Sequence, residues 1–425
     1  MSRTALLLAA YQCAPEQGSA SQIGWEWFAG LQQKHAVTLV THARNRAALD
    51  AAGSRAPETE ILYIDTEWFA GPLYRLAQRL FPSSEHSVFL IASLDYFLYD
   101  FLAWRTLRTR QRRGQRWDLI HRVTPVTLAA PSWLSRLGLA VVIGPVNCGL
   151  QNPTGFQTIL RRDSSWLVHV RALARLLDGV IGSTRQAAHI LTATRASLQA
   201  VPRRHRDRCS MMLENGVHLE RYTDLDWPAH PGATQPLRML FVGRLIPVKA
   251  LEFLLEACAN LIAAGQPVVL EVVGSGPMEA TWRALAQTLR LDERQVIFHG
   301  ALPATSVVAA LARCHALCLP SVRESGGAVL LEAMAAARPV IALNYGGPAE
   351  IVDATVGARL PFESPAQVVR DLTATLHDIV QHPQAWQARA ARSRQIAAER
   401  FSWRAKMNSI SSLYADLLAK ETQHA

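Results

Sequence analysis

Short apolar runs alternate with longer helical stretches along almost the whole of this 425-residue chain. Several of the short runs, such as VVLEVVG and PVIAL, are apolar at consecutive positions rather than at every second one. A strand of this kind is buried on both faces, as in a parallel sheet covered by helices. The pattern therefore predicts a doubly wound α/β architecture. Strands are predicted at residues 5–9, 37–41, 61–64, 119–123, 140–143 and 179–181, and again at 238–242, 268–273, 296–299, 316–319 and 340–342.

A polar, proline-rich stretch near residues 215–236 marks a linker between two halves of similar size. We expect an N-terminal Rossmann-like domain in residues 1–215 and a C-terminal one in residues 216–400. The helical pattern of residues 401–425 is expected to pack back on the N-terminal domain. Two such domains are expected to face each other across a cleft at the carboxyl ends of their sheets, where α/β proteins bind ligands.

The positive charge is unevenly distributed. The net charge is +10, and the whole excess lies in residues 1–215, with a dense run, RTLRTRQRRGQR, at 105–116. Such a half suits an anionic membrane surface or an anionic acceptor. A plain solvated helix face remains the alternative. No nucleic-acid partner is expected, because the run lacks interleaved aromatic residues and the signature of a nucleic-acid-binding fold.

The most apolar segment, residues 88–104, contains Asp95 and Asp100 and is shorter than the ~20 residues that a membrane span needs. We therefore expect no transmembrane helix. The opening MSRTALLLAAYQCAPEQG has only a short apolar run, which is interpreted as a first buried strand, so no signal peptide is expected either. The six cysteines are interpreted as buried thiols in a reducing compartment. The expected location is cytoplasmic, with peripheral attachment at the inner face of the cytoplasmic membrane.

The stretch RESGGAVLLEAMAAARPV at residues 323–340 places two carboxylates around a pair of glycines. Glu324 is expected in a loop after a strand, and Glu332 about one turn inside a helix that starts near Gly327. Gly326 and Gly327 let the backbone approach a ligand, and the free N–H groups of a helix start attract anions. The alternative is a helix-initiating acidic residue plus a surface glutamate.

A second group of residues follows an earlier strand, in RMLFVGRLIPVKA. Gly243 is followed by Arg244 and then by Lys249, one of only four lysines in the chain. Two cations in a loop between strand and helix can neutralise a diphosphate leaving group without a metal. Two solvated charges are the alternative. Gly274, in VVGSGP, belongs to a GxG that lacks the third glycine of a dinucleotide fingerprint and therefore indicates a tight turn.

No metal or other cofactor is expected. Asp224 and Asp226 in DLD resemble the DxD motif of metal-dependent sugar transferases, but they fall in the linker rather than after a strand. The closely spaced Cys314 and Cys318 lie in an apolar run that is typical of a strand rather than of a zinc loop.

Taken together, ESGGAVLLEAMAAARPVIALNYGGPAEIV, VGRLIPVKA and VVGSGP resemble the retaining glycosyltransferases of family four, which have the GT-B fold. The segments AAYQCAPEQGSASQIGWEW, WDLIHRVTPVTLAAPSWLSRLG, VVIGPV, LENGV and FSW resemble its bacterial exopolysaccharide subgroup. The resemblance covers nearly the whole chain, and it is the order and spacing of the motifs that make it specific.

The resemblance implies roles for individual residues. Glu332 matches the glutamate that holds the nucleotide ribose, Glu324 the one beside the donor sugar, and Arg244 with Lys249 the pair that clamps the diphosphate. His121 matches a position near the reacting centre, although a buried, hydrogen-bonded histidine remains the alternative. The other matched donor-binding positions are Gly18, Ser19, Gly243, Gly274, Gly326, Gly327, Ala328 and Val329.

The chain also departs from the family pattern. Many members have Phe-Gly where this chain has Gly326 and Gly327, and many have a second histidine where this chain has Val123. The resemblance implies transfer of a hexosyl group from a nucleotide-diphosphate sugar to a glycan or a polyprenyl-diphosphate-linked acceptor, with retention and without a metal. A nucleotide-sugar epimerase of the same fold and a non-catalytic, basic membrane-binding protein are the alternatives.

Overall fold

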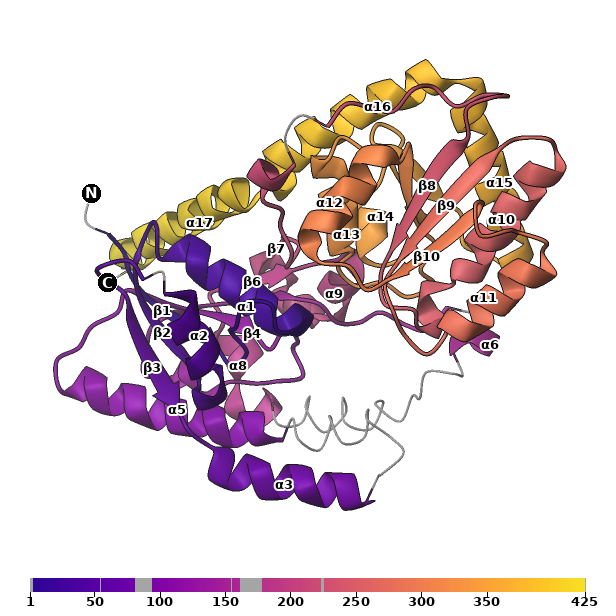
Figure 1. Cartoon of the computed structure of the whole chain (residues 1–425). Helices are drawn as coiled ribbons and strands as arrows, with labels where there is room; N and C mark the ends of the chain where they lie inside the picture. Colours follow the sequence, from indigo (N-terminus) through magenta and orange to yellow (C-terminus); the bar gives the residue numbers. More distant parts are fainter. Residues whose placement is uncertain are drawn as a thin grey trace. The chain divides into compact units, whose positions relative to one another are not determined.

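The computed structural model describes residues 3–53, 55–80, 94–153, 155–160, 178–222 and 225–424, so Asp224 of the DLD motif lies outside the described residues. The chain forms two compact units, each built on one sheet (Figure 1). The first unit comprises Met1–Gly149, Ser165–Glu214 and Met407–Ala425, and the second comprises Leu150–Ser164 and Asn215–Lys406. The chain thus enters the second unit at Leu150, well before the proline-rich stretch, and the later boundary falls inside its last helix.

The sheet of the first unit is parallel, with the strand order β3-β2-β1-β4-β5-β6-β7. Its central strands are buried on both faces; Leu6, Leu7 and Leu8, for example, have no exposed surface. The strands are β1 (Ala5–Ala10), β2 (Ala36–His42), β3 (Glu60–Ile64), β4 (Leu119–Thr124), β5 (Ala140–Val146), β6 (His189–Thr192) and β7 (Cys209–Met211). The helices are α1 (Gly18–Leu31), α2 (Arg46–Ala52), α3 (Glu67–Leu80), α5 (Asp95–Arg112), α8 (Ser183–Gln186), α9 (Arg195–Ala200) and most of α17 (Trp403–His424).

The sheet of the second unit is also parallel, with the order β10-β9-β8-β11-β12-β13. The strands are β8 (Leu237–Val242), β9 (Val268–Val273), β10 (Val296–Gly300), β11 (Ala316–Leu319), β12 (Val340–Leu343) and β13 (Gly357–Leu360). The helices are α6 (Gln157–Leu160), α10 (Leu251–Ala263), α11 (Glu279–Thr288), α12 (Ala304–Arg313), α13 (Ala328–Ala335), α14 (Gly347–Ile351), α15 (Pro365–Gln381) and α16 (Pro383–Ile396). In both sheets the order reverses beside the first strand, which is the arrangement of a Rossmann-like fold.

The predicted fold class, two doubly wound α/β domains, is confirmed. One predicted strand is wrong, because residues 179–181 are helical and end at Gly182, whose φ of 79° is left-handed. Three short strands were not predicted: β6, β7 and β13. Their positions follow from pairing with neighbouring strands rather than from a pattern of their own; β6, for example, pairs with the longer β5, with Ile190 in register with Ile143.

Two further observations concern the cysteines and the helices. All six cysteines are free; Cys314, directly after α12, and Cys318, within β11, are both buried. Within the described ranges, no helix combines the length and the apolar character that crossing a membrane requires.

Candidate functional site

The loops after β8 and β9 pack backbone against backbone at the carboxyl edge of the second sheet. The Gly243 N–H donates to the Val273 carbonyl over 3.0 Å. Gly274 has a φ of 135°, and a Cβ at this position would lie 1.9 Å from the Gly243 carbonyl oxygen. Only glycine fits such an approach. Gly243 and Gly274 therefore shape the loop that carries Arg244.

The two predicted cations differ in their surroundings. Arg244, two residues after β8, is exposed. Lys249 ends the short 3₁₀ turn Pro247–Lys249, and its side chain is only 15% exposed. Its ammonium group makes an ion pair with Glu324, whose side chain is 14% exposed. The structure thus brings together one cation and one carboxylate that the sequence had placed in separate motifs.

Glu324 is held from several sides in the loop after β11. One carboxylate oxygen pairs with Lys249, and the other accepts the Gly327 N–H over 3.3 Å. Its backbone carbonyl accepts the N–H of Gly347 over 3.0 Å. Gly346 has a φ of 63°, and a Cβ there would lie 2.1 Å from the same carbonyl oxygen. The sequence analysis did not select Gly346 and Gly347; the paired glycines in NYGGP were the available signal.

Helix α13 begins directly beside this carboxylate. Its N-cap is Gly327, with a φ of 61°, a conformation that glycine adopts without strain. The first helical residues, Ala328 and Val329, carry N–H groups that have no partner within the helix. The start of α13 is therefore a positive dipole end at the carboxyl edge of the sheet, suited to a phosphate or a sugar oxygen. Gly326, just before the cap, is buried.

Glu332 lies one turn further along α13. Burial raises the pKa of its carboxyl to about 7, and the nearby Arg221 offsets part of that rise. The pKa of the Tyr222 hydroxyl is also raised, mainly by burial and to a smaller extent by the charge of Glu332. Ionisation of a buried carboxyl costs free energy. A ligand that donates hydrogen bonds to the carboxylate reduces this cost. The sequence analysis missed Arg221 and Tyr222, which follow the LENGV motif.

His121 belongs to the first unit, in the interior of β4, where it has no exposed surface. One ring nitrogen, Nε2, donates to the Gly144 carbonyl over 2.7 Å, so Nδ1 accepts the Tyr414 hydroxyl over 2.6 Å. The edge of the Trp27 ring packs against it with the ring centroids 5.2 Å apart. Burial lowers the pKa of the imidazole to about 4, so it is neutral at pH 7. In this conformation neither ring nitrogen of His121 is free to contact a substrate. The surroundings of the ring are those of a buried, hydrogen-bonded histidine.

Gly18 and Ser19 also belong to the first unit, where they are the first two residues of α1. Gly18 has a φ of 65°, and a Cβ at this position would meet no atom within 4 Å. Its left-handed backbone, rather than lack of space, is therefore the reason for glycine here. In the described part of the chain, no group of three or more histidine, cysteine or acidic side chains is arranged to hold a metal ion.

Comparison with known proteins relates part of this chain to glycosyltransferases. Residues 226–393, which include β8, β11 and α13, match the family model described as "Glycosyl transferases group 1". This part of the chain is therefore similar to the glycosyltransferase group 1 family. The D-inositol 3-phosphate glycosyltransferase of Corynebacterium glutamicum is 33% identical over 188 residues, which are 43% of this chain and 44% of that protein. The putative colanic acid biosynthesis glycosyltransferase WcaL of Salmonella typhimurium is 32% identical over 160 residues, 36% of this chain and 38% of that protein.

The alignments thus span less than half the length of these curated relatives. Similarity of structure extends further. The crystal structure of Anabaena HepE in complex with UDP and glucose superposes with a TM-score of 0.60 over 97% of this chain and 99% of that chain, at 16% identity. This likeness shows that the chain has the GT-B fold, with two parallel-sheet α/β domains.

Proposed function

We propose that the chain is a retaining, metal-independent glycosyltransferase that moves a hexosyl group from a nucleotide-diphosphate sugar to a glycan or a polyprenyl-diphosphate-linked acceptor. The observation that carries the proposal is the cluster at the carboxyl edge of the second sheet. There Lys249 and Glu324 form an ion pair, the start of α13 lies beside them, and Arg244 projects from the adjoining loop.

These groups suit the most demanding part of glycosyl transfer. When the bond from the anomeric carbon to the diphosphate breaks, the leaving oxygen keeps the bonding electron pair and becomes more negative. Arg244, Lys249 and the N–H groups of α13 are fixed positive groups that stabilise this charge more than they stabilise the intact donor. Two cations and a helix start supply the stabilisation that a divalent ion gives in other transferases, which is the reason for proposing a reaction without a metal.

The donor is proposed to bind with its ribose at Glu332 and its sugar near Glu324. The raised pKa of the buried Glu332 carboxyl supports this, because hydroxyl groups of a ribose would supply the hydrogen bonds that an ionised form needs. HepE, which shares the fold, was crystallised with UDP and glucose. A UDP-sugar is therefore the first donor to test.

Retention is proposed from the resemblance to family four. The new bond to the acceptor oxygen would form on the face that the diphosphate leaves, and the acceptor proton would pass to the departing phosphate oxygen. No carboxylate is assigned as a nucleophile. Since His121 is buried and neutral, with both ring nitrogens in hydrogen bonds, we assign it no contact with the substrate.

The acceptor is proposed to belong to cell-surface polysaccharide synthesis at the inner face of the cytoplasmic membrane. The excess positive charge of residues 1–215 supports an anionic acceptor or surface. The curated relative WcaL is named for colanic acid biosynthesis, which is consistent with an exopolysaccharide role.

The proposal is tested with the purified full-length protein. A thermal-shift screen of UDP-, GDP-, ADP- and dTDP-sugars is expected to show stabilisation by one donor class. With that donor and a lipid-linked or free glycan acceptor, we expect a product whose anomeric configuration, read by NMR, is that of the donor, at a rate unchanged by EDTA. An altered sugar formed from the donor alone would indicate an epimerase, and stabilisation by none of the sugars would refute the proposal.

A further inference from the structure

Helix α3 of the first unit carries an unusual share of exposed apolar surface. Five of the large hydrophobic side chains that are exposed in the described chain lie on this one helix: Trp68, Phe69, Tyr74, Leu76 and Leu80. Leu76 is 51% exposed and Leu80 is 61% exposed. Only Ala70 and Ala77 of the helix are buried. Exposed apolar side chains gathered in this way mark a surface that contacts something else.

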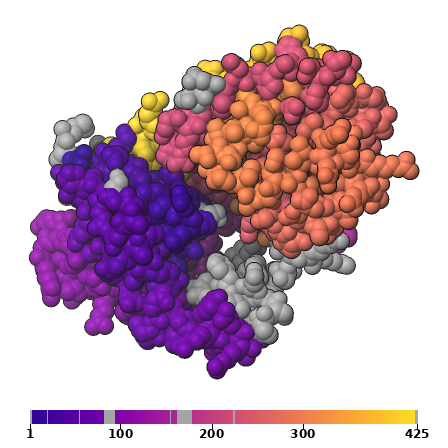
Figure 2. Space-filling model, viewed as in Figure 1, coloured from indigo at the N-terminus to yellow at the C-terminus, as the bar shows by residue number. Residues whose placement is uncertain are grey.

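Three of these exposed apolar side chains share one face of α3. Phe69, Leu76 and Leu80 are separated by seven and four residues, so they lie on one face of a 3.6-residue helix. Arg75 and Arg79 are also exposed and lie on a neighbouring face. Figure 2 shows α3, in purple toward the bottom of the view, at the surface of the first unit. A helix with an apolar face bordered by arginines is typical of proteins that lie on a lipid surface.

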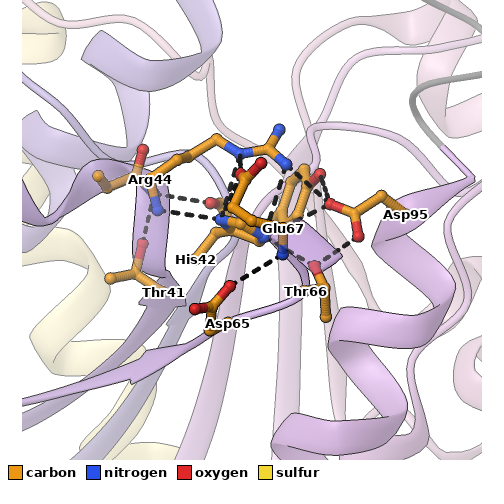
Figure 3. A network of polar contacts seen from close by, with 9 residues as sticks. Thr41, His42, Arg44, Asp65, Thr66, Glu67 and Asp95 are labelled. Atoms are coloured by element: carbon orange, nitrogen blue, oxygen red, sulfur yellow. Dashed lines mark hydrogen bonds and ion pairs between the residues drawn. The ribbon is translucent and has the colours of Figure 1, made fainter. Parts of the chain in front are cut away.

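The start of α3 is fixed to the sheet by a network of polar side chains (Figure 3). Arg44, which follows β2, donates to Glu67 in the first turn of α3 over 3.1 Å and to Asp95 in the first turn of α5 over 2.9 Å. Thr66, just before α3, donates to Asp95 as well, and it accepts from His42 over 2.7 Å. Burial and the Arg44 charge lower the pKa of His42, so it is neutral in this role.

This network has a consequence for the helix. Asp95, His42 and Thr66 have no exposed surface, so the bonds among them just before α3 are protected from solvent, while the Arg44–Glu67 pair in the first turn is exposed. Phe69, Leu76 and Leu80 take no part in them. The helix is thus anchored at its first turn while its apolar face stays available. An exposed helix that served only to cover the core would be expected to bury its larger apolar residues rather than two alanines.

The charge of the same unit indicates which partner the surface fits. Helix α5 begins against the start of α3, through the Thr66–Asp95 bond, and carries the exposed Arg105, Arg108 and Arg112 further along. An anionic lipid surface is attracted to such charge, and a second copy of the same unit is repelled by it.

We propose that α3 is the surface by which the first unit docks on an anionic lipid bilayer. Phe69, Leu76 and Leu80 enter the boundary between headgroups and acyl chains, while Arg75 and Arg79 contact lipid phosphates. This proposal rests on the proposed function in one respect only: the docking would hold the enzyme at the surface where a lipid-linked acceptor is presented. It places the membrane contact on α3, whereas the sequence analysis related an anionic surface only to the basic half, residues 1–215, as a whole.

The test is cosedimentation of the full-length protein with vesicles of phosphatidylethanolamine and phosphatidylglycerol, and with vesicles of phosphatidylcholine alone. We expect binding to the anionic vesicles that weakens as salt is raised. The double variant Leu76→Glu/Leu80→Glu should bind at least tenfold more weakly. Val180→Glu is the matched control, because Val180 is 69% exposed elsewhere in the first unit, and it should bind like the unmodified protein.

Several outcomes would overturn the proposal. Equal binding of the α3 variant and the control would place the contact elsewhere, and binding that does not distinguish anionic from neutral vesicles would remove the role of Arg75 and Arg79. A dimer in solution that only the α3 variant dissociates would make α3 an interface between copies. Donor thermal shifts, measured without vesicles, separate this proposal from the proposed function, because the α3 variant should retain them in full.

Discussion

The raised pKa of Glu332 makes a specific prediction for donor binding. Because burial lifts the carboxyl pKa to about 7, only about a tenth of the donor-free protein has an ionised Glu332 at pH 6, and about nine-tenths has it at pH 8. An ionised carboxylate accepts hydrogen bonds from ribose hydroxyls more strongly than the neutral acid. If the ionised form binds the donor, the dissociation constant should fall about tenfold from pH 6 to pH 8.

The assay is isothermal titration of the full-length protein with a nucleotide sugar at pH 6, 7 and 8. A nucleotide sugar is preferred to a free nucleoside diphosphate, whose terminal phosphate titrates in the same range. Glu332→Gln is the matched variant, since it keeps the size of the side chain and removes the ionisation. It should bind more weakly at pH 8 and show a flat dependence on pH.

The same shift predicts an opposite effect on stability without donor. The folded-state pKa of Glu332 is raised above its ordinary value of 4.5, so its stabilising contribution is complete below pH 4.5 and is lost as the pH rises through about 7. The loss between pH 5 and pH 8 amounts to about 2.5 kcal/mol. Glu332→Gln should therefore gain about this much relative to the unmodified protein over the same range, as measured by urea unfolding. The reasoning is refuted if donor affinity is independent of pH in the unmodified protein, or if the variant retains the same slope.

Three further changes test other parts of the structure. Arg244→Ala should lower kcat by about a hundredfold and change the donor dissociation constant, measured by titration, by no more than a few-fold. The reason is that an exposed cation in this loop acts mainly on the charge of the leaving group. A loss of affinity with unchanged kcat would contradict this. Tyr414→Phe should lower the free energy of unfolding by about 1–3 kcal/mol, because it leaves the buried Nδ1 of His121 without its hydrogen-bond donor. Unchanged stability in urea unfolding would argue against the assigned hydrogen bond. Gly346→Ala should lower the free energy of unfolding by about 2 kcal/mol or more and weaken donor binding, because its Cβ would lie 2.1 Å from a carbonyl oxygen of the loop after β11. The control is Gly232→Ala, whose Cβ would meet no atom within 4 Å. It should change neither thermal stability nor donor affinity.

The candidate site in the second unit could be proposed from the sequence because its residues lie close to the ends of predicted strands. Arg244 and Lys249 follow β8, and Glu324 follows β11, which pairs directly with β8. Since carboxyl ends of parallel strands meet at one edge of a sheet, strand prediction alone brings these motifs near each other. It does not give the ion pair between Lys249 and Glu324, which depends on the conformations of the loops that follow the two strands.

The surroundings of His121 could not be inferred in the same way. Its partner Tyr414 is 293 residues away, on the last helix, and its other partner is a backbone carbonyl, which leaves no mark in the sequence. A histidine at a strand is equally compatible with a catalytic and a packing role. Only the three-dimensional contacts of both ring nitrogens distinguish them.

Helix α3 illustrates a different limit. Its sequence, EWFAGPLYRLAQRL, has apolar residues at helical spacing, which normally predicts a face packed on the core. Spacing alone does not tell whether the apolar face meets the protein or another phase, because both environments remove it from water. The distinction came from burial, which falls on Ala70 and Ala77 while Leu76 and Leu80 stay exposed.

The Lys249–Glu324 pair connects the geometry of the second unit to the chemistry proposed for it. Each side chain is about 15% exposed, so either one left alone would bear a desolvation cost; together they keep the ammonium group in place before a donor arrives. The pair also limits how strongly the loop attracts a diphosphate in the ground state, because the carboxylate cancels one of the two cations. In the proposed reaction, Arg244, Lys249 and the start of α13 would interact more strongly with the charge that builds up on the leaving oxygen than with the bound donor. An arrangement of this kind favours the transition state over tight substrate binding, which is the condition for raising kcat rather than only lowering KM.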